Sequence, residues 1–264
     1  MRPRFYTKYS KEELKLSTKP FASGGEGELY HITSPRQYKH LAVKVYYPEK
    51  RSPHRKQKII YLIKNPPISI SEKQHPPIGW PMDVIFQDKE FVGLLLPLLK
   101  GNKLTILTLS KLPRRIDPEW QRFSLKNPDA FKLRLRLCFN IASTLFQIHN
   151  MGLYTLVDLK PDNVLVQSNG LVSIVDMDSV EVIEKNHVLF PAPVATPEYS
   201  PPEKYTKDRK IADLVLESWD RFSMAVIFYQ LLFGLHPFAA SSKAPYDHLV
   251  GLDDKTEILP AEFW

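Results

Sequence analysis

The chain of 264 residues, 43% of them hydrophobic, is long enough to bury a sizeable core as one large domain or two lobes. Its composition excludes a collagen, a disordered chain and a disulfide scaffold, and the single cysteine, Cys138, cannot form an internal bridge. The longest apolar run, residues 93–99, is too short to cross a bilayer and no signal peptide is evident, so we expect a soluble cytoplasmic protein without a membrane span.

Positive charge is concentrated at the front of the chain. The formal net charge is +7, yet residues 1–64 hold 15 Lys and Arg against 5 Asp and Glu. A solvated helix face explains most such clusters, but a basic field also speeds association with acidic partners. An acidic partner therefore stays open, whereas nucleic-acid binding rests on this charge alone and is the weakest hypothesis. The densest basic residues are Lys50, Arg51, Arg55, Lys56 and Lys58.

The first elements in chain order are strands around a glycine-rich turn. Residues 21–45 predict three strands, and the turn 24–27 carries glycines whose backbone N–H groups can approach phosphates. The strand 41–46 alternates apolar side chains and carries Lys44, an ammonium that can be aimed at the same phosphates. Each signal is weak alone, because a plain hairpin and a solvent-facing lysine have the same pattern.

A helix and a hairpin complete the front half. Residues 52–64 have a helical pattern that ends at Asn-Pro-Pro, a strong stop signal. After a proline-rich loop, the apolar runs 84–86 and 91–96 predict a hairpin. Residues 98–101 are expected to cross to a second lobe.

The second half is expected to be mainly helical. Asn127-Pro128-Asp129 is a good helix start, and an apolar stripe then predicts a long helix ending near residues 149–152. A strongly apolar helix is expected over 217–233, and residues 177–203 are expected to be irregular. The side chains expected on the buried side of the first helix are Phe131, Leu135, Cys138, Ala142 and Leu145.

The most informative stretch follows the first long helix. Two valine-rich runs flank Asn169-Gly170, the strongest short-range hairpin signal. A two-residue type I′ turn at these positions sets Asn163 opposite Asp176, and both side chains then lie on one face, near Asp158 and Lys160. Two oxygen ligands with a lysine suit Mg²⁺ carrying a polyphosphate. The alternative is a surface turn rich in Asp, Asn and Pro for conformational reasons only.

Taken in order, these motifs resemble those of the protein kinase superfamily over roughly residues 18–240, as a divergent, prokaryotic-like serine/threonine kinase domain. The resemblance implies an α+β fold of two lobes, a β-rich N-lobe (1–97) and a mainly helical, shortened C-lobe (98–264). The similar stretches are the glycine-rich loop at 22–29, the lysine strand at 41–44, the catalytic loop at 158–163, the Asp-Phe-Gly position at 176–178, the end of the activation segment at 195–203, and the central helix and its exit at 218–223 and 234–238.

The resemblance also implies roles for individual residues. Asp158 would accept or orient the proton of the substrate hydroxyl, and Lys160, whose position is typical of serine/threonine kinases, would neutralise the transferring phosphoryl group. Asn163 and Asp176 would bind Mg²⁺, and Lys44 would hold the phosphates of ATP. The other nucleotide contacts are expected at Ala22, Ser23, Gly24, Gly25, Gly27, Leu29, Ala42, Leu96, Pro97, Leu99 and Leu165.

The chain departs from the family pattern around the catalytic loop. Leu156-Val157 replaces the usual His-Arg, whose arginine pairs with a phosphate on the activation segment. Residues 180–194 contain no Ser, Thr or Tyr, so we expect activity that is independent of phosphorylation there. Asp178 replaces the family's glycine and adds an acidic group near the metal.

The helix 52–64 contains no glutamate, so the ion-pair partner that the family supplies to Lys44 is missing or lies elsewhere. Gln57 is the first candidate, with Glu49 and Glu72 behind it. The sequence given ends at Trp264, so we expect either a reduced second lobe, in which Glu203 loses its usual arginine partner, or a fragment of a longer protein.

An ATP- and Mg²⁺-dependent serine/threonine protein kinase is the leading hypothesis, because every group that contacts phosphate or metal in the family has a counterpart here. ATP and a protein substrate are then the expected partners. The alternative is a pseudokinase, a nucleotide-binding or allosteric scaffold, which the missing helix glutamate and the altered catalytic-loop flank favour.

Overall fold

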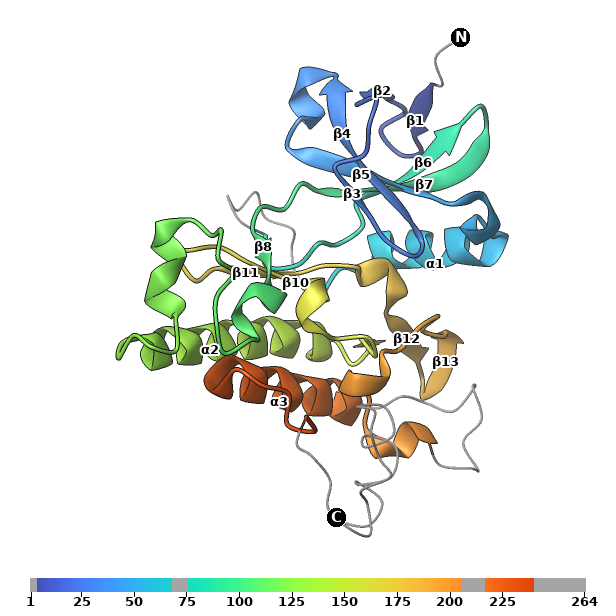
Figure 1. The fold of residues 1–264 in the computed structure, drawn as a ribbon. Helices are drawn as coiled ribbons and strands as arrows, with labels where there is room; N and C mark the ends of the chain where they lie inside the picture. Colours follow the sequence, from blue (N-terminus) through green and yellow to red (C-terminus); the bar gives the residue numbers. More distant parts are fainter. Residues whose placement is uncertain (1–3, 68–75, 206–216, 240–264) are drawn as a thin grey trace. The chain divides into compact units, whose positions relative to one another are not determined.

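The computed structural model describes residues 4–67, 76–205 and 217–239, and the chain divides into two compact units, Met1–Leu99 and Lys100–Trp264 (Figure 1). Strands fill the first unit and helices dominate the second, which confirms the predicted α+β class. In the described part of the chain, no helix combines the length and the apolar character needed to cross a bilayer.

A seven-stranded sheet forms most of the first unit, in the order β2-β1-β6-β7-β5-β4-β3. Its core lies on one face, around Ile32, Val43 and Leu95. The three strands predicted over residues 21–45 are present as β3, β4 and β5. The strands are β1 (Phe5–Thr7), β2 (Glu13–Leu16), β3 (Ala22–Ser23), β4 (Gly27–Ser34), β5 (Leu41–Tyr46), β6 (Asp83–Gln87) and β7 (Glu90–Pro97), with short 3-10 helices η1 (Arg36–Tyr38) and η2 (Pro48–Lys50).

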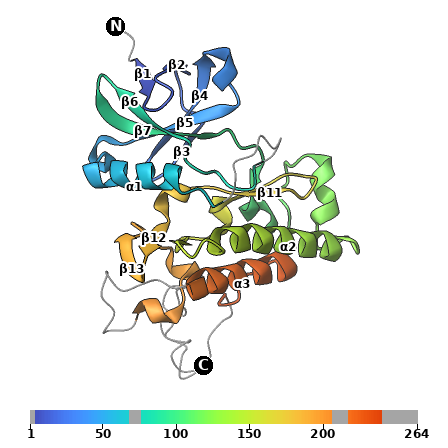
Figure 2. The same cartoon turned by 180° about the vertical axis from the view of Figure 1, so that it is seen from behind.

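Helix α1 (Pro53–Lys64) packs against β6 and begins where the sequence predicts (Figure 2). The side chain of Ser52 accepts a hydrogen bond from the backbone N–H of Arg55 at 3.1 Å, which caps the helix. The predicted hairpin β6–β7 turns at Asp88 and Lys89, whose φ angles of 47° and 74° suit a tight turn between twisted strands.

Two helices, α2 (Ala130–His149) and α3 (Glu217–Phe233), pack on each other in the second unit (Figures 1 and 2). Helix α3 spans the predicted residues. Helix α2 begins later than predicted, because Asn127 forms a turn ahead of it: its carbonyl accepts from the N–H of Ala130 at 3.0 Å. Among the described residues of this unit, the other helices are 3-10 turns: η3 (Leu104–Leu107), η4 (Pro118–Phe123), η5 (Pro161–Asn163), η6 (Met177–Ser179), η7 (Pro197–Tyr199) and η8 (Pro202–Tyr205).

The buried side of α2 is only partly the predicted one. Cys138 and Leu145 are buried and Ala142 is half-buried, whereas Phe131 and Leu135 are 54% and 43% exposed. Two apolar stripes with the same helical period run along this helix, and periodicity alone does not tell which one faces the core. The buried apolar residues of α2 are Ala130, Leu137, Cys138, Ile141, Leu145 and Ile148.

Arg134 lies in the buried side of α2 and ties three segments together. Its guanidinium donates to the carbonyl oxygens of Leu107 at 2.7 Å, Phe123 at 2.8 Å and Leu231 at 2.5 Å. Leu231 is in the last turn of α3, where helix carbonyls lack partners of their own. Burial lowers the pKa of Arg134 to about 10, so the side chain stays charged at neutral pH.

Six short strands of the second unit form two three-stranded sheets, ordered β11-β10-β8 and β13-β12-β9. The prediction that residues 177–203 are irregular is wrong, because β12 and β13 form a hairpin there that turns at Lys185 and Asn186. The strands are β8 (Asn102–Lys103), β9 (Tyr154–Thr155), β10 (Val164–Val166), β11 (Val172–Ile174), β12 (Glu181–Glu184) and β13 (His187–Phe190).

The predicted hairpin at residues 164–175 is present as β10–β11, but its register is one residue off. Gly170 alone in the loop has a positive φ, 90°, and its N–H donates to the carbonyl of Gln167 at 2.9 Å. The loop therefore has three residues and not the two of a type I′ turn. As a result the carbonyl of Asn163 accepts from the N–H of Val175, and Asn163 does not face Asp176.

Candidate active site

Asp158 lies at the centre of a group of polar side chains in the second unit. Its side chain is 5% exposed, and Oδ2 lies 2.8 Å from Nζ of Lys160. Oδ1 accepts a hydrogen bond from the hydroxyl of Thr196 at 2.5 Å, and Lys160 donates to that same hydroxyl oxygen at 2.7 Å. A carboxylate, an ammonium and a hydroxyl thus form a closed triangle.

Thr196 is a member of this triangle that sequence reasoning missed. It lies in the stretch 195–203 that resembles the end of the activation segment, but nothing in its local sequence shows that it contacts a loop 38 residues away. Because the hydroxyl both donates and accepts, Thr196 links Asp158 to Lys160 and fixes the segment that carries it.

Asn163 belongs to the same site. Its amide nitrogen donates to the backbone carbonyl of Asp158 at 2.9 Å and lies 3.4 Å from Oδ2 of that residue. With the nitrogen directed at Asp158, the amide oxygen is the atom that Asn163 offers to a cation.

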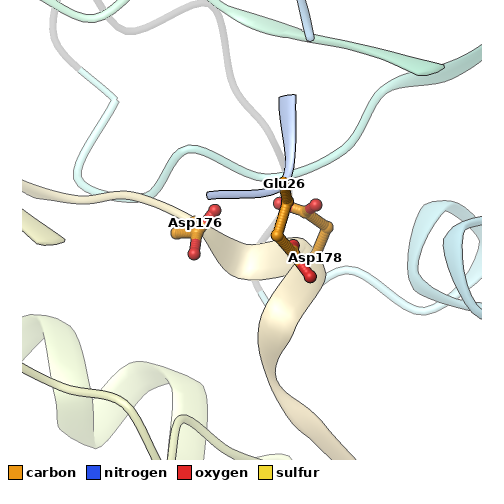
Figure 3. Close-up of side chains that lie close together, drawn as sticks. All are labelled: Glu26, Asp176 and Asp178. Carbon is orange, nitrogen blue, oxygen red and sulfur yellow. The ribbon is translucent and has the colours of Figure 1, made fainter. Parts of the chain in front are cut away.

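Asp176 directly precedes the single turn of η6, and Asp178 lies within that turn (Figure 3). Asp176 has a left-handed backbone, φ 66° and ψ 35°, so the chain leaves the direction of β11 here. Its Oδ2 accepts from the hydroxyl of Ser179 at 3.1 Å, and Asp178 is buried. A magnesium ion shared by Asn163 and Asp176 stays a prediction, and facing strand positions no longer support it.

Asp220 of α3 holds the backbone just before Asp158. Its buried carboxylate accepts from the N–H groups of Leu156 and Val157, each at 2.8 Å, and Oδ2 lies 2.8 Å from Nε2 of His149. Val157 has a φ of 66°, which is unfavourable for a β-branched residue. The two hydrogen bonds to Asp220 therefore stabilise a strained turn next to Asp158.

The side chain of Val157 packs into a small apolar cluster with Trp219, and Ala192 and Ala195 pack against the two. This apolar contact stands where the family resemblance implies an arginine paired with a phosphate. The pairing of β12 with β9 also fixes the stretch of chain that leads to Ala192 and Ala195.

In the first unit, strand register places predicted nucleotide residues on one face of the sheet. Ala22 pairs with Leu29, Leu29 with Lys44, and Ala42 with Leu96. Directly paired residues share a face, and residues two apart on β5 do so too, so all five point the same way. Val43 and Leu95 point to the opposite face, into the core cluster.

The remaining predicted nucleotide residues lie beside these or in the second unit. Pro97 ends β7 opposite Leu41, and Leu99 is half-buried at the end of the first unit. Ser23 is exposed in β3, and Leu165 lies on β10 in the second unit, paired with Ser173.

The glycines of the turn 24–27 have different reasons to be glycine. A Cβ on Gly27 would lie 2.3 Å from the carbonyl oxygen of Val45, so β4 and β5 can approach only without it. A Cβ on Gly24 or Gly25 would meet no atom within 4 Å. Packing in the described structure does not require these two glycines, which suits a loop whose backbone approaches a ligand.

One partner of Lys44 is Glu26, from the glycine-rich turn. Nζ of the buried Lys44 lies 3.8 Å from Oε2 of Glu26, and Oε1 of Glu26 accepts from Nη2 of Arg55 at 2.5 Å. Gln57, the first candidate from the sequence, is exposed on α1, and Glu49 is exposed in η2. Glu72, the third, lies outside the described residues.

Known proteins place this architecture in a family. A family model for the protein kinase domain matches residues 18–255, and the chain therefore belongs to the protein kinase family. The solved structure "ROP18 kinase domain in complex with AMP-PNP and sucrose" aligns with 98% of this chain and 80% of its own, at a TM-score of 0.59 and 17% sequence identity, and so supports the fold alone.

Several curated proteins named as kinases are similar in sequence. Serine/threonine-protein kinase MRCK gamma of Homo sapiens is 29% identical over 177 residues, which is 66% of this chain and 10% of that protein. Citron rho-interacting kinase of Rattus norvegicus is 28% identical over 162 residues, 60% of this chain and 7% of that protein. The chain thus spans only about a tenth of the length of such relatives.

Proposed function

We propose that the protein is an active serine/threonine protein kinase that transfers the γ-phosphoryl group of ATP to a protein hydroxyl with the help of Mg²⁺. The triangle of Asp158, Lys160 and Thr196 carries this proposal, because it joins the acid and the cation that the reaction needs to the activation segment. The name of the similar serine/threonine-protein kinase MRCK gamma and the place of Lys160, two residues after Asp158, support a serine or threonine acceptor.

The residues present fit a magnesium-bound nucleotide. Asp176 and Asn163 offer carboxylate and amide oxygens, the ligand types that Mg²⁺ takes in proteins. Open space surrounds Gly24 and Gly25, and Lys44 shares one face of the sheet with the other nucleotide-contact positions. When bound, Mg²⁺ would neutralise negative charge on the β- and γ-phosphates. We propose residues 1–97 as the lobe that covers the nucleotide and 98–264 as the catalytic lobe.

The side chains of the second unit would then act mainly by position and charge, which is most of what phosphoryl transfer requires. Asp158 would hold the acceptor hydroxyl and take up its proton. Thr196 fixes one oxygen of that carboxylate, so the other faces Lys160, whose ammonium would offset the charge of the transferring group.

We further propose that this activity does not depend on phosphorylation of the activation segment. Val157 and Trp219 hold Ala192 and Ala195 by apolar contact, and the β12–β13 hairpin contains no hydroxyl side chain. An ordered segment of this kind needs no arginine–phosphate pair to hold it.

Two further features bear on partners and on the alternative function. Arg51 donates to the carbonyl of Tyr46 and Arg55 pairs with Glu26, so part of the basic cluster acts within the first unit, and an acidic partner stays a prediction. The second candidate function is a pseudokinase scaffold. It is favoured by the fact that α1 supplies Arg55, and no acid, toward the lysine strand.

Labelled ATP tests catalysis directly. The purified chain is incubated with Mg²⁺, γ-labelled ATP and casein, next to the variants Asp158→Asn and Asp162→Asn. Asp162 lies on the same loop but is exposed and pairs only weakly with Lys103, so it is the matched control. We expect Asp158→Asn to lose at least about a hundredfold in rate and Asp162→Asn to stay near wild type. Equal background in all three proteins, with ATP still bound, would establish the scaffold.

A further inference from the structure

We infer that Glu26 is the positioning residue for Lys44 and that Arg55 holds Glu26 in place. Helix α1 would thus supply a cation, and the glycine-rich turn would supply the acid. The inference rests on the proposed phosphate-binding role of Lys44. Lys44, Glu26 and Arg55 all belong to the first unit.

The three side chains are nearly buried, with 11% of Lys44, 14% of Glu26 and 14% of Arg55 exposed. A charge withdrawn from water to this degree needs a compensating partner. Glu26 divides its two oxygens between the two cations, with Oε1 on Arg55 at 2.5 Å and Oε2 facing Lys44 at 3.8 Å. Since 3.8 Å exceeds hydrogen-bond length, Glu26 attracts the ammonium without binding it tightly.

The side-chain cations of Lys44 and Arg55 both lie over the aromatic ring of Tyr46. Its ring is fully buried, with Nζ of Lys44 5.5 Å and Cζ of Arg55 4.7 Å from the ring centroid. Both cations gain from the face of the ring but repel each other. A carboxylate between them attracts both and so offsets that repulsion, and Glu26 thereby lowers the cost of holding two cations against one ring.

The backbone of Glu26 is fixed to the strand that carries Lys44. Its carbonyl accepts from the N–H of Tyr47 at 3.0 Å, just beyond β5, and the next residue, Gly27, sits directly on the carbonyl of Val45. The acid therefore has a defined position relative to the lysine. A lysine side chain is flexible and a point charge, so an acid fixed in this way sets where the ammonium lies.

The same contact allows an opposite interpretation, in which Glu26 masks Lys44 and competes with phosphates for it. The two differ in sign. If Glu26 positions Lys44, removing its charge weakens ATP binding, whereas if Glu26 masks Lys44, removal strengthens it. The long contact to Lys44 and the short one to Arg55 favour positioning, because the carboxylate is held mainly by the arginine.

The test compares ligands with and without phosphates. Calorimetry measures the Kd of Mg-ATP and of adenosine for wild type, Glu26→Gln, Arg55→Met and Lys44→Met. The matched controls are Glu49→Gln, an exposed acid in η2, and Lys56→Met, the neighbour of Arg55 on α1. We expect Glu26→Gln and Arg55→Met to reduce the preference for ATP over adenosine about tenfold, with the adenosine Kd and both controls within about twofold of wild type. Arg55→Lys should keep most of the preference, because it keeps the charge.

An unchanged preference for ATP over adenosine in Glu26→Gln would overturn the inference. Tighter binding of ATP by Glu26→Gln would overturn it as well, because it would mean that Glu26 masks Lys44. An Arg55→Lys protein with as low a preference for ATP as Arg55→Met would also contradict it. Adenosine binding serves as the check of folding. If Glu26→Gln does not fold, Glu26→Asp replaces it, since the shorter side chain should lower the ATP preference as well. If Lys44→Met itself leaves the preference unchanged, the proposed role of Lys44 fails. If Lys44→Met lowers it and Glu26→Gln does not, only the present inference fails.

Discussion

The two units hold their key charged groups by different means. In the first unit, Lys44 is oriented by another side chain, Glu26, which a third side chain, Arg55, holds in turn. In the second unit, the segment before Asp158 is held through its backbone, since Asp220 accepts from two successive N–H groups. Ion pairs between side chains position the charged group in the first unit, whereas in the second unit a buried carboxylate fixes the backbone by hydrogen bonds.

The two arrangements differ in how easily another residue can take over the role of the acid. An ion pair between side chains needs only opposite charges within reach, so its acid can come from a turn as well as from a helix. Backbone N–H groups point in fixed directions and need an acceptor at one place. We therefore expect substitution of Asp220 to lower the stability of the second unit, and substitution of Glu26 or Arg55 to weaken ligand binding by the first unit.

The largest expected effect is that of Asp220→Ala. It leaves the buried N–H groups of Leu156 and Val157 without their acceptor and removes the hydrogen-bond partner of Nε2 of His149, so we expect a loss of about 3–5 kcal/mol in the free energy of unfolding. Urea denaturation followed by tryptophan fluorescence measures it. Asp162→Ala, which removes an exposed carboxylate, should cost less than about 1 kcal/mol. Similar losses in the two variants would mean that Asp220 does not hold this backbone.

The next effect separates two glycines of the same turn. Gly27→Ala brings a Cβ to within 2.3 Å of a carbonyl on β5, so we expect about 2–3 kcal/mol of destabilisation. Gly25→Ala meets no neighbour and should leave the Tm unchanged while it weakens ATP binding. Thermal unfolding and ATP titration of both variants check this. A Gly25→Ala protein that loses Tm but binds ATP normally would contradict a ligand-facing role for the turn.

Val157 tests the apolar hold on the activation segment. Val157→Ala removes two methyl groups from the contact with Trp219, Ala192 and Ala195, with an expected cost of about 1–2 kcal/mol and a partial loss of phosphate transfer. Val157→Arg should lose more activity, because a guanidinium replaces the apolar contact, and it should not make activity dependent on phosphorylation. Rates before and after phosphatase treatment measure that dependence. A rate of Val157→Arg that falls on phosphatase treatment would be evidence against an apolar hold.

Local patterns predicted the elements whose cause is local. Ser52 marks the start of α1, and the turn at Asp88 and Lys89 follows from a short gap between apolar runs, so the sequence predicts both elements correctly. The position of the β10–β11 turn is predicted correctly. Asn-Gly fits a loop of two residues as well as a loop of three, however, and the predicted two-residue loop shifts the strand register by one residue. One shifted residue was enough to separate Asn163 from the position opposite Asp176.

What the sequence did not predict depends on contacts between distant residues. Thr196 reaches Asp158 across 38 positions and Asp220 reaches Val157 across 63, and neither distance leaves a periodic trace. The sequence does not predict Glu26 as a partner of Lys44, because the family resemblance implies an acid on the helix 52–64. The pairing of β4 with β5 brings the glycine-rich turn next to Lys44, and this pairing is itself a contact between residues far apart in the sequence.

The smallest expected effect is a dependence of stability on pH through His236, beyond the end of α3. Burial lowers the pKa of His236, whose Nε2–H donates to the carbonyl of Glu198 and whose Nδ1 accepts from the N–H of Phe238. The folded protein therefore resists protonation of this ring, while the unfolded chain takes up the proton near its usual pKa. Its contribution is complete above about pH 6.5 and is lost as the pH falls below that value.

His236→Gln keeps an N–H donor for Glu198 and removes the titration. Between about pH 7.5 and about pH 5.5 the Tm of wild type should fall further than the Tm of His236→Gln, since all other titrating groups are common to both. The difference is expected to be smaller than the loss for Val157→Ala, because a single ring with one carbonyl contact is involved. Parallel Tm curves would show that His236 is not held neutral, and a larger fall for His236→Gln would reverse the sign. Either result would mean that the backbone at Glu198 is positioned by the hydrogen bonds of its neighbours Tyr199 and Ser200. The side chains of these two residues do not titrate in this pH range.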